Sequence, residues 1–346
     1  MNLVAASPLA GAAYRVRHEP TEIDAVVLAG TYSRAWRPEL PPRPTVPVAN
    51  VPLVVHVLSW LAAAGVRRAT MCANGSTDAL RRLLRTGAQP PLPEVRYYSD
   101  SMPRGAAGCV RDAAPPGGHR PVLVVDGAAI PTIDLDEVLA AHARSGAALT
   151  VVTQASPDGR RDRPLEPAGI YVCDPRALEF VPRAGYHDIK EELVPRLHAA
   201  GEPIQIYAAP NAFPHVLNLQ TYFAANGWVL EQEIASAADA RWREYERVGD
   251  MLVHRTARVH ATAFAIGPVL IGAGADVEPG AVLVGPTVVG DRSVLRAGSV
   301  VSRSVAWRDC VVGAEAMIDV SLLCDGVHVA AGETLRQAVR LASCHA

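Results

Sequence analysis

The amino-acid sequence predicts an α/β protein with two successive folds, a Rossmann-like domain and then a C-terminal left-handed parallel β-helix. In the first part of the chain, short apolar runs such as residues 25–28 and 121–129 alternate with helical stretches, which is typical of a mostly parallel sheet. From Val259 onward an aliphatic residue recurs at every sixth position, which is the period of hexapeptide-repeat β-helices. A chain of 346 residues is long enough for two domains of this kind.

These patterns also place the domain boundaries. We expect residues 1–22 to form a flexible N-terminal tail, which lacks the apolar core of a signal peptide. The α/β domain is predicted over 23–230, and a linker containing a polar helix (231–247) over 231–250. The β-helix is predicted over 251–335 and a C-terminal tail over 336–346.

Composition argues against several classes of partner. The formal net charge is −2, so nothing indicates binding to nucleic acid or to an anionic membrane. No apolar run is long enough to span a bilayer. The six cysteines are scattered, without a CxxC pair or metal-ligand spacing, which indicates reduced thiols in a cytoplasmic protein.

The first candidate site lies in the segment 25–52. The run 25–28 predicts a buried strand, Ala29 and Gly30 form a small-residue turn, and Leu53–Ala64 predicts a helix. A strand, a loop and a helix make up a mononucleotide-binding half, in which the loop glycine lets backbone amides approach a phosphate or a base. The alternative is an ordinary turn between a strand and a helix, because a short glycine signal is weak by itself.

A second glycine turn occurs within residues 103–112. Gly105 and Gly108 lie at the start of a predicted helix, and such a helix N-terminus suits an anion or the edge of a base. A plain helix-entry turn is the alternative here.

A carboxylate follows the next buried strand. The apolar run 121–129 contains the strand end Asp126-Gly127. Ligands bind outside the carboxyl ends of strands in open α/β sheets, and an aspartate there can hold Mg²⁺ between phosphate oxygens.

The remaining elements follow from periodicity. Further strands are predicted at 69–73, 95–98 and 147–152, and further helices at 78–84 and 188–198.

The β-helix pattern is regular over eight hexads. The aliphatic first positions, expected to point inward, are Val259, Ala265, Ile271, Val277, Leu283, Val289, Leu295 and Val301. The fifth positions, expected at the corners, are Ala263, Val269, Ala275, Ala281, Thr287, Ser293, Ser299 and Val305. The rhythm weakens after Trp307, and we expect it to continue to about Glu333.

Four segments of the chain resemble one enzyme family. They are Ala25-Val-Val-Leu-Ala-Gly30, Arg37-Pro38, Pro42-Arg-Pro44 and Pro47-Val-Ala-Asn-Val-Pro52. Together they resemble the signature of the sugar-nucleotide pyrophosphorylases, nucleotidyltransferases that join a sugar 1-phosphate to an NTP. The likeness is strongest to the mannose-1-phosphate guanylyltransferase and glucose-1-phosphate nucleotidyltransferase branches, and it implies a nucleotidyltransferase domain followed by a β-helix.

The resemblance also implies site residues. It assigns nucleotide binding to Leu28, Ala29, Gly30, Gly105, Ala107 and Gly108, and sugar binding to Gly127, Glu166, Ala168 and Gly169. It implies Mg²⁺ as the cofactor if the protein is active, and Asp126 could serve as its ligand only if the end of its strand were shifted by two residues.

Several positions depart from the family pattern. The family's catalytic arginine falls on Ala35, its Pro-Lys-Pro lysine on Arg43, and its two metal-binding aspartates on Ala128 and His215. A hairpin that carries a sugar-phosphate lysine is missing from the short loop 156–164. Losing one preorganised charge contact typically costs ~10²–10³ in rate, so this combination predicts binding without turnover.

Three functions remain open. The first is a catalytically degenerate family member that binds a nucleotide sugar and serves as a regulatory or scaffold subunit beside an enzyme of nucleotide-sugar or polysaccharide synthesis. The second is an active pyrophosphorylase in which Arg34, Arg37 or Arg43 and Asp126 have taken over the chemistry.

The third function is an acyltransferase that uses a β-helix histidine. The candidates are His254, His260 and His328, although solvent-facing histidines are the simpler interpretation. Under all three hypotheses the flat faces of the β-helix predict a homo-oligomer.

Overall fold

The computed structural model describes residues 21–30, 35–86, 92–99, 102–115, 118–155, 164–235 and 242–342, without the side chains of residues 21, 22, 86 and 233–235. The chain forms two compact units. The α/β unit contains the described residues up to Val46 and Val51–Thr221, and the β-helix unit contains Pro47–Asn50 and the chain from Tyr222 onward. The predicted tail at 1–22 and the loop at 156–164 lie almost wholly outside the described residues.

A seven-stranded sheet forms the centre of the α/β unit, with the order β5-β4-β1-β6-β8-β7-β9. Its strands are β1 (Thr21–Leu28), β4 (Val66–Cys72), β5 (Glu94–Tyr98), β6 (Val122–Asp126), β7 (Leu149–Gln154), β8 (Glu166–Cys173) and β9 (Ile204–Ala208). Strand β1 is parallel to β4 and β6, whereas β8 runs antiparallel to β6 and β7. In register, Leu28 lies opposite both Cys72 and Asp126, so three strands end at the same edge.

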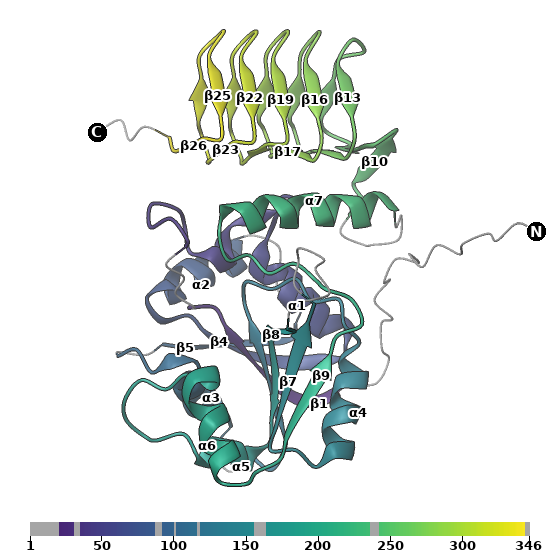
Figure 1. The fold of residues 1–346 in the computed structure, drawn as a ribbon. Coiled ribbons are helices and arrows are strands. Elements are labelled where there is room, and N and C mark those ends of the chain that lie inside the picture. Colours follow the sequence, from purple (N-terminus) through teal and green to yellow (C-terminus); the bar gives the residue numbers. More distant parts are fainter. Residues whose placement is uncertain are drawn as a thin grey trace, which may run out of the picture. The chain divides into compact units, whose positions relative to one another are not determined.

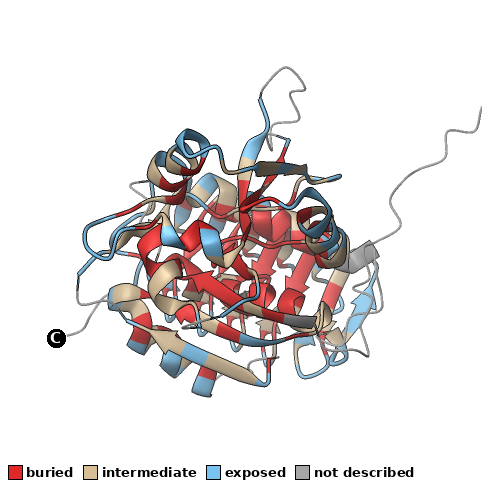
Figure 2. Ribbon diagram, turned by 90° about the horizontal axis from the view of Figure 1, so that it is seen from below, coloured by how far each residue is buried: buried red, intermediate tan, exposed pale blue. Residues whose placement is uncertain are grey.

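Helices cover both faces of this sheet. Their bounds are α1 (Leu53–Ala63), α2 (Thr77–Thr86), α3 (Gly105–Ala113), α4 (Leu135–Ser145), α5 (Pro175–Glu179), the π-helix η3 (Ile189–Leu193) and α6 (Val194–Ala199), with 3₁₀ turns η1 (Arg43–Thr45) and η2 (Asn74–Ser76). Alternate residues of β1 enter two cores, one with α1, α2 and α4 and the other with α3, α5 and α6. Buried residues gather along the strands and the helix sides that face them (Figure 2).

The predicted fold class is confirmed, and most predicted elements are found within a few residues of their expected places. One helix was misplaced. The polar helix expected over 231–247 is replaced by α7 (Leu219–Ala235), and Tyr245–Val248 is a strand, β10. The polar composition of residues 231–247 did not reveal that the helix begins in the preceding, more apolar segment.

Three sheets, parallel except for the antiparallel edge strand β10 (Tyr245–Val248), form the left-handed β-helix (Figure 1). The first contains β10, β11 (Met251–His254), β14 (Val269–Ile271), β17 (Thr287–Val289), β20 (Val305–Ala306), β23 (Leu322–Leu323) and β26 (Val339–Arg340). The second contains β12 (Arg258–Val259), β15 (Asp276–Val277), β18 (Val294–Leu295), β21 (Val311–Val312) and β24 (His328–Val329). The third contains β13 (Phe264–Ile266), β16 (Val282–Val284), β19 (Val300–Ser302), β22 (Met317–Asp319) and β25 (Thr334–Arg336).

The hexad pattern identifies the inward side chains. Every first and fifth hexad position from Val269 to Val305 is buried, whereas Val259, Ala263 and Ala265 of the first coil are only half-buried. Strand β10 pairs antiparallel with β11 beside that coil, and the last strand extends the solenoid beyond Glu333 to Arg340.

A shorter corner explains why the rhythm weakens late in the chain. Val282 pairs with Val300, 18 positions later, but Val300 pairs with Met317, 17 positions later. The earlier corner uses the two residues Gly285-Pro286, whereas the later one uses Arg303 alone, at a φ of 47°. The inward positions therefore shift by one, to Ala306, Val312 and Ile318, and after a second short corner at Val320, at a φ of 45°, they shift by two, to Leu323, Val329 and Leu335; all six are buried.

Helix α7 joins the solenoid through hydrogen bonds inside the β-helix unit. The amide of Ala49 donates to Oδ1 of Asn226 at 2.8 Å, and the Tyr222 hydroxyl donates to the carbonyl of Pro47 at 2.6 Å. Nδ2 of Asn50 donates to the carbonyl of Val289 at 3.2 Å. These contacts explain why Pro47–Asn50 belongs to this unit although its neighbours in sequence do not.

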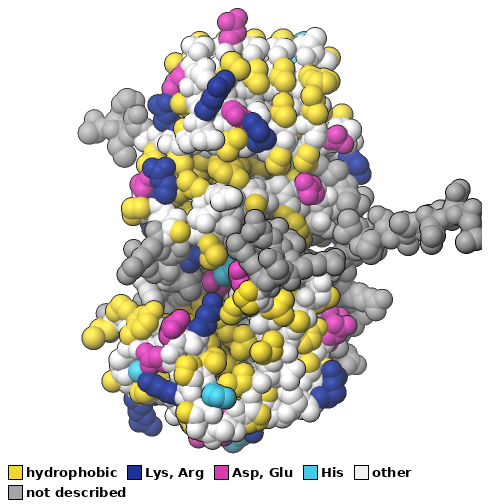
Figure 3. Space-filling model, in the orientation of Figure 1, with side chains coloured by type: hydrophobic (Ala, Val, Ile, Leu, Met, Phe, Trp, Pro, Cys, Tyr) yellow, Lys and Arg dark blue, Asp and Glu magenta, His cyan; other side chains and the backbone are white. Residues whose placement is uncertain are grey.

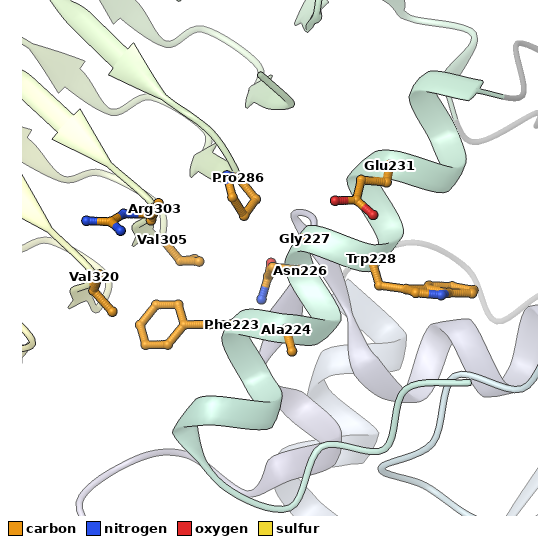
Figure 4. A pocket seen from close by; sticks show the side chains of 10 residues that line it. All are labelled: Phe223, Ala224, Asn226, Gly227, Trp228, Glu231, Pro286, Arg303, Val305 and Val320. Carbon is orange, nitrogen blue, oxygen red and sulfur yellow. The ribbon is translucent and has the colours of Figure 1, made fainter. Parts of the chain in front are cut away.

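Two surface features belong to the β-helix unit. A cavity of about 460 Å³ lies between α7 and the solenoid corners; its lining includes Phe223, Trp228, Pro286 and Val305 (Figure 4). The outward face of the third sheet gathers hydrophobic side chains (Figure 3), with Phe264 57%, Ile266 54% and Met317 45% exposed. None of the described helices is both long and apolar enough to cross a membrane.

Candidate functional site

Asp126 lies at the carboxyl edge of the sheet, where β1 and β6 end together. Its side chain is 15% exposed, and its Oδ1 accepts a hydrogen bond of 2.9 Å from the amide of Ala128. The edge of an open α/β sheet at this point is where ligands bind, so Asp126 marks the candidate site.

His215 faces Asp126 across the end of β6. The segment Pro214–Val216 pairs with Ala128–Ile130: the amide of Ile130 donates to Pro214 and the amide of Val216 donates to Ala128, each at 2.9 Å. This pairing fixes the backbone of His215 and brings its Nε2 to 3.0 Å from Oδ2 of Asp126. Both carboxylate oxygens of Asp126 are thus engaged by groups of the protein.

Arg43 supplies a positive charge near Asp126. Arg43 is only 4% exposed, and Nη1 of its guanidinium donates a hydrogen bond of 3.0 Å to the carbonyl of Val216. Burial would raise the pKa of Asp126, but the hydrogen bond from His215 and the charges of His215 and Arg43 outweigh it and lower that pKa below its usual value. Burial lowers the pKa of Arg43, and the charge of Asp126 opposes that effect.

Gly169 makes room for the Asp126–His215 pair. Its φ is +76°, and a Cβ added there would lie 2.9 Å from Cβ of Asp126 and 3.5 Å from Cε1 of His215. Gly127 is similarly confined, because an added Cβ would lie 3.2 Å from Cα of Ala29. These two predicted sugar-binding glycines, with the buried Ala168 beside Gly169, therefore line the ends of β6 and β8 around Asp126.

The first glycine loop uses its amides inside the domain. The amides of Ala29 and Gly30 both donate to the carbonyl of Cys72, at 2.8 and 2.9 Å. Gly30 is required by close approach, since an added Cβ would lie 2.9 Å from the carbonyl carbon of Ala73. The expectation that these amides are free to meet a phosphate is therefore wrong, although Leu28, Ala29 and Gly30 do border the site.

The second glycine loop is paired in the same way. The amides of Ala107 and Gly108 donate to the carbonyl of His187 at 2.9 and 3.4 Å. Gly105, at a φ of +72°, packs against the backbone of the same residue. Arg104 fastens this contact by donating to Asp112 and to the carbonyl of Gly185. The helix N-terminus at α3 is thus satisfied by a carbonyl of the protein, which anion binding through these amides would have to displace.

The other predicted residues do not join Asp126 in the described contacts. Arg37 is exposed and pairs with Glu39, and Glu166 is exposed at the start of β8. Arg34 lies outside the described residues. His254 is buried and contacts Thr256 and Glu244, whereas His260 and His328 are exposed.

The side chains around Asp126 do not fit Mg²⁺. This ion demands a near-octahedral shell of oxygen ligands, usually carboxylates, phosphates and water. Here a single carboxylate faces an imidazole and a guanidinium, and both of its oxygens already accept hydrogen bonds. Across the described part of the chain, no three His, Cys, Asp or Glu side chains come together to hold a metal ion.

Comparison with known proteins agrees with the fold. Residues 26–163 match the family model described as nucleotidyl transferase. Mannose-1-phosphate guanylyltransferase of Mycobacterium tuberculosis is 26% identical over 271 residues, covering 71% of this chain and 74% of that protein. Mannose-1-phosphate guanylyltransferase 1 of Arabidopsis thaliana is 23% identical over 272 residues, covering 70% and 74%.

A solved structure shares the fold. HddC from Yersinia pseudotuberculosis, complexed with GMP-PN, superposes with a TM-score of 0.52 at 15% identity, and the match covers 60% of this chain and 99% of HddC. The sheet with its carboxyl-edge site and the matching segment define a nucleotidyltransferase fold joined to a β-helix. The match of residues 26–163 to the nucleotidyl transferase model and the similarity to mannose-1-phosphate guanylyltransferases support a member of the sugar-nucleotidyltransferase family.

Proposed function

We propose that this protein binds a nucleotide or a nucleotide sugar without converting it, and serves as a regulatory or scaffold subunit in nucleotide-sugar or polysaccharide synthesis. Its relatives are mannose-1-phosphate guanylyltransferases by name, so a guanine nucleotide and GDP-mannose are the first ligands to consider. The candidate site lies at the carboxyl edge of the sheet, where ligands of this fold class bind.

The placement of the positive charges carries the proposal. Nucleotidyl transfer builds negative charge around the α-phosphorus, and preorganised cations must lie where that charge develops. Ala35 offers a methyl group at the position that the resemblance gives to the catalytic arginine, and it is exposed. Arg43, at the lysine position, is buried and held by the carbonyl of Val216.

Binding is less demanding than catalysis. It requires shape and a modest number of contacts, whereas turnover requires each charge at its place in the transition state. The glycines beside Asp126 allow the close packing of the Asp126–His215 pair at the edge of the sheet, where a ligand of this fold class would bind. Losing one transition-state contact costs ~10²–10³ in rate, so a site altered at several positions retains binding far better than turnover.

Thermal unfolding with a panel of ligands tests the binding half of the proposal. The panel contains GTP, other NTPs, GDP-mannose and other nucleotide sugars. A ligand at 100 times its Kd should stabilise the native state by ~2.7 kcal/mol and raise the melting temperature. If no member of the panel stabilises the wild-type protein, the proposed function is contradicted.

Two glycine substitutions localise the binding. In Gly169→Ala the new Cβ meets Asp126, and we expect most of the ligand-induced stabilisation to disappear. Gly201→Ala is the matched control, because Gly201 has a similar φ of +74° but nothing within 4 Å of an added Cβ. Both variants carry the same kind of backbone strain, so only the difference between them reports on the site.

A homo-oligomer is part of the proposal. The outward ladder of the third β-helix sheet places Phe264, Val282, Val300 and Met317 in register. Two copies related by a two-fold axis would set each Phe264 against Met317 of the other copy, with the valines at the centre. Such a flat apolar face supports self-association and would present two nucleotide sites to a partner enzyme.

A further inference from the structure

We infer that the side chain of His215 takes the place of a divalent cation in this site, so that the protein binds the phosphates of its ligand without a metal ion. The inference deepens the proposed function and rests on it for the nucleotide ligand. It is carried by the groups that surround Asp126 in this chain.

Both carboxylate oxygens of Asp126 accept hydrogen bonds from the protein. Oδ1 accepts from the amide of Ala128 at 2.9 Å, and Oδ2 accepts from Nε2 of His215 at 3.0 Å. A metal ion binding to either oxygen would have to share that oxygen with a backbone amide or with the imidazole N–H. The imidazole could not then serve as a good ligand itself, because Mg²⁺ prefers oxygen.

The charges around the carboxylate of Asp126 also disfavour a divalent cation. Arg43 is the second cationic group that acts on Asp126, and it is held in place by the carbonyl of Val216. One carboxylate is already balanced by this guanidinium, so an added divalent ion would meet no net attraction from the pair. No second acid joins Asp126 and His215 in a metal-holding group within the described ranges.

The pair is built into the fold. The backbone on both sides of His215 is fixed by hydrogen bonds to Ala128 and Ile130, and the side chains of His215 and Asp126 are each only 15% exposed. Gly169 leaves the space that the imidazole and the carboxylate occupy. A surface histidine that rotates freely would have neither this fixed backbone nor this burial. We therefore assign His215 the role of positioning the carboxylate of Asp126.

Manganese binding in the absence of nucleotide tests the inference directly. Mn²⁺ favours the same oxygen ligands as Mg²⁺ and is detected by electron paramagnetic resonance. The full-length wild type, His215→Gln and the control His328→Asp should leave Mn²⁺ free. His215→Asp should bind Mn²⁺, because it replaces the imidazole beside Asp126 with a second carboxylate. The double variant His215→Asp/Asp126→Asn should lose that binding.

Two results of this titration would overturn the inference. One is Mn²⁺ binding by the wild type that Asp126→Asn removes. The other is a folded His215→Asp protein, verified by circular dichroism and its melting transition, that still binds no Mn²⁺. The control at His328 lies on an exposed β-helix strand and introduces the same charge change away from Asp126.

A second arm uses the wild type alone and does not depend on the folding of any variant. The Kd of GDP-mannose, measured by calorimetry, should differ by less than about twofold between EDTA and Mg²⁺, whereas ligand binding through a bound metal ion would weaken strongly in EDTA. Wild-type binding that disappears in EDTA would overturn the inference. Absence of GDP-mannose binding in both buffers would instead contradict the proposed function, and the manganese titration would still decide the role of His215.

Discussion

The indole Nε1 of Trp307 donates a hydrogen bond of 2.8 Å to the hydroxyl of Tyr222, which in turn donates to the carbonyl of Pro47 at 2.6 Å. Trp307 belongs to a β-helix coil and Tyr222 to α7, and both side chains are buried. This chain of hydrogen bonds therefore fastens helix, solenoid and the Pro47–Asn50 segment into one unit.

Removing the hydroxyl should destabilise that unit. In Tyr222→Phe the indole and the Pro47 carbonyl both lose a partner inside the protein, which costs about 1–3 kcal/mol for a buried polar group. Urea unfolding of the variant measures this loss. Tyr186→Phe is the control, because Tyr186 is 61% exposed and should change stability little. Equal stability of Tyr222→Phe and the wild type would show that this hydrogen bond does not hold the unit together.

Asp126 and His215 should be energetically coupled. A double-mutant cycle with Asp126→Asn and His215→Gln isolates the interaction, and a charge-assisted hydrogen bond of this kind contributes about 1–3 kcal/mol. The pair Glu244–Arg255 provides the comparison, because its side chains are 54% and 62% exposed and exposed pairs contribute about 0–1 kcal/mol. A coupling energy no larger than that of the exposed pair would contradict the site described here.

His142 should make stability depend on pH. Its ring is buried on α4 with Nδ1 2.8 Å from Oγ1 of Thr150, and burial lowers its pKa below the usual 6.5. The unfolded chain therefore takes up a proton first. The stability gained from the neutral ring is full above pH 6.5 and is lost as pH falls through the lower, folded-state pKa.

The variant His142→Gln tests this dependence. Its unfolding free energy should fall less steeply than that of the wild type as pH drops below 6.5, because one titrating group has been removed. His119→Gln serves as the control, since His119 is exposed, and should keep the wild-type slope. Identical slopes for His142→Gln and the wild type would refute the assignment.

Self-association should depend on the third β-helix sheet. Phe264→Ser removes the largest exposed apolar side chain from the outward face of this sheet and should weaken the oligomer. Sedimentation velocity over a range of concentrations measures this effect. Leu165→Ser is the matched control: it also removes an exposed apolar side chain, 49% exposed, but from the α/β unit. An oligomer unaffected by Phe264→Ser, or a wild-type monomer at all concentrations, would exclude this face as the interface.

The sequence predicted best where the signal is local. A hexad is visible in six consecutive positions, and the inward residues from Ile271 to Val301 are buried as expected. The same periodicity concealed the shift after Ser302, because one residue at a corner, Arg303, replaces two without changing the chemistry of the flanking strands. Strand ends were also predictable, and Asp126 is the last residue of β6.

The site was harder to predict because its contacts are distant in sequence. His215 was identified as the residue at a metal-ligand position, but its hydrogen bond to Asp126 spans 89 residues and depends on the pairing of Pro214–Val216 with Ala128–Ile130. The amides of the glycine loops looked free because their acceptors, the carbonyls of Cys72 and His187, lie on other elements. Only the folded arrangement reveals that these donors are already used.

Pyrophosphate exchange tests binding without turnover most directly. Purified protein that binds GDP-mannose would be incubated with Mg²⁺ and labelled pyrophosphate, and formation of labelled GTP would be followed. The account predicts a rate at least about 10³-fold below the ~10 s⁻¹ typical of enzymes. Exchange at about 1 s⁻¹ or faster, lost in Asp126→Asn, would contradict it and identify an active nucleotidyltransferase.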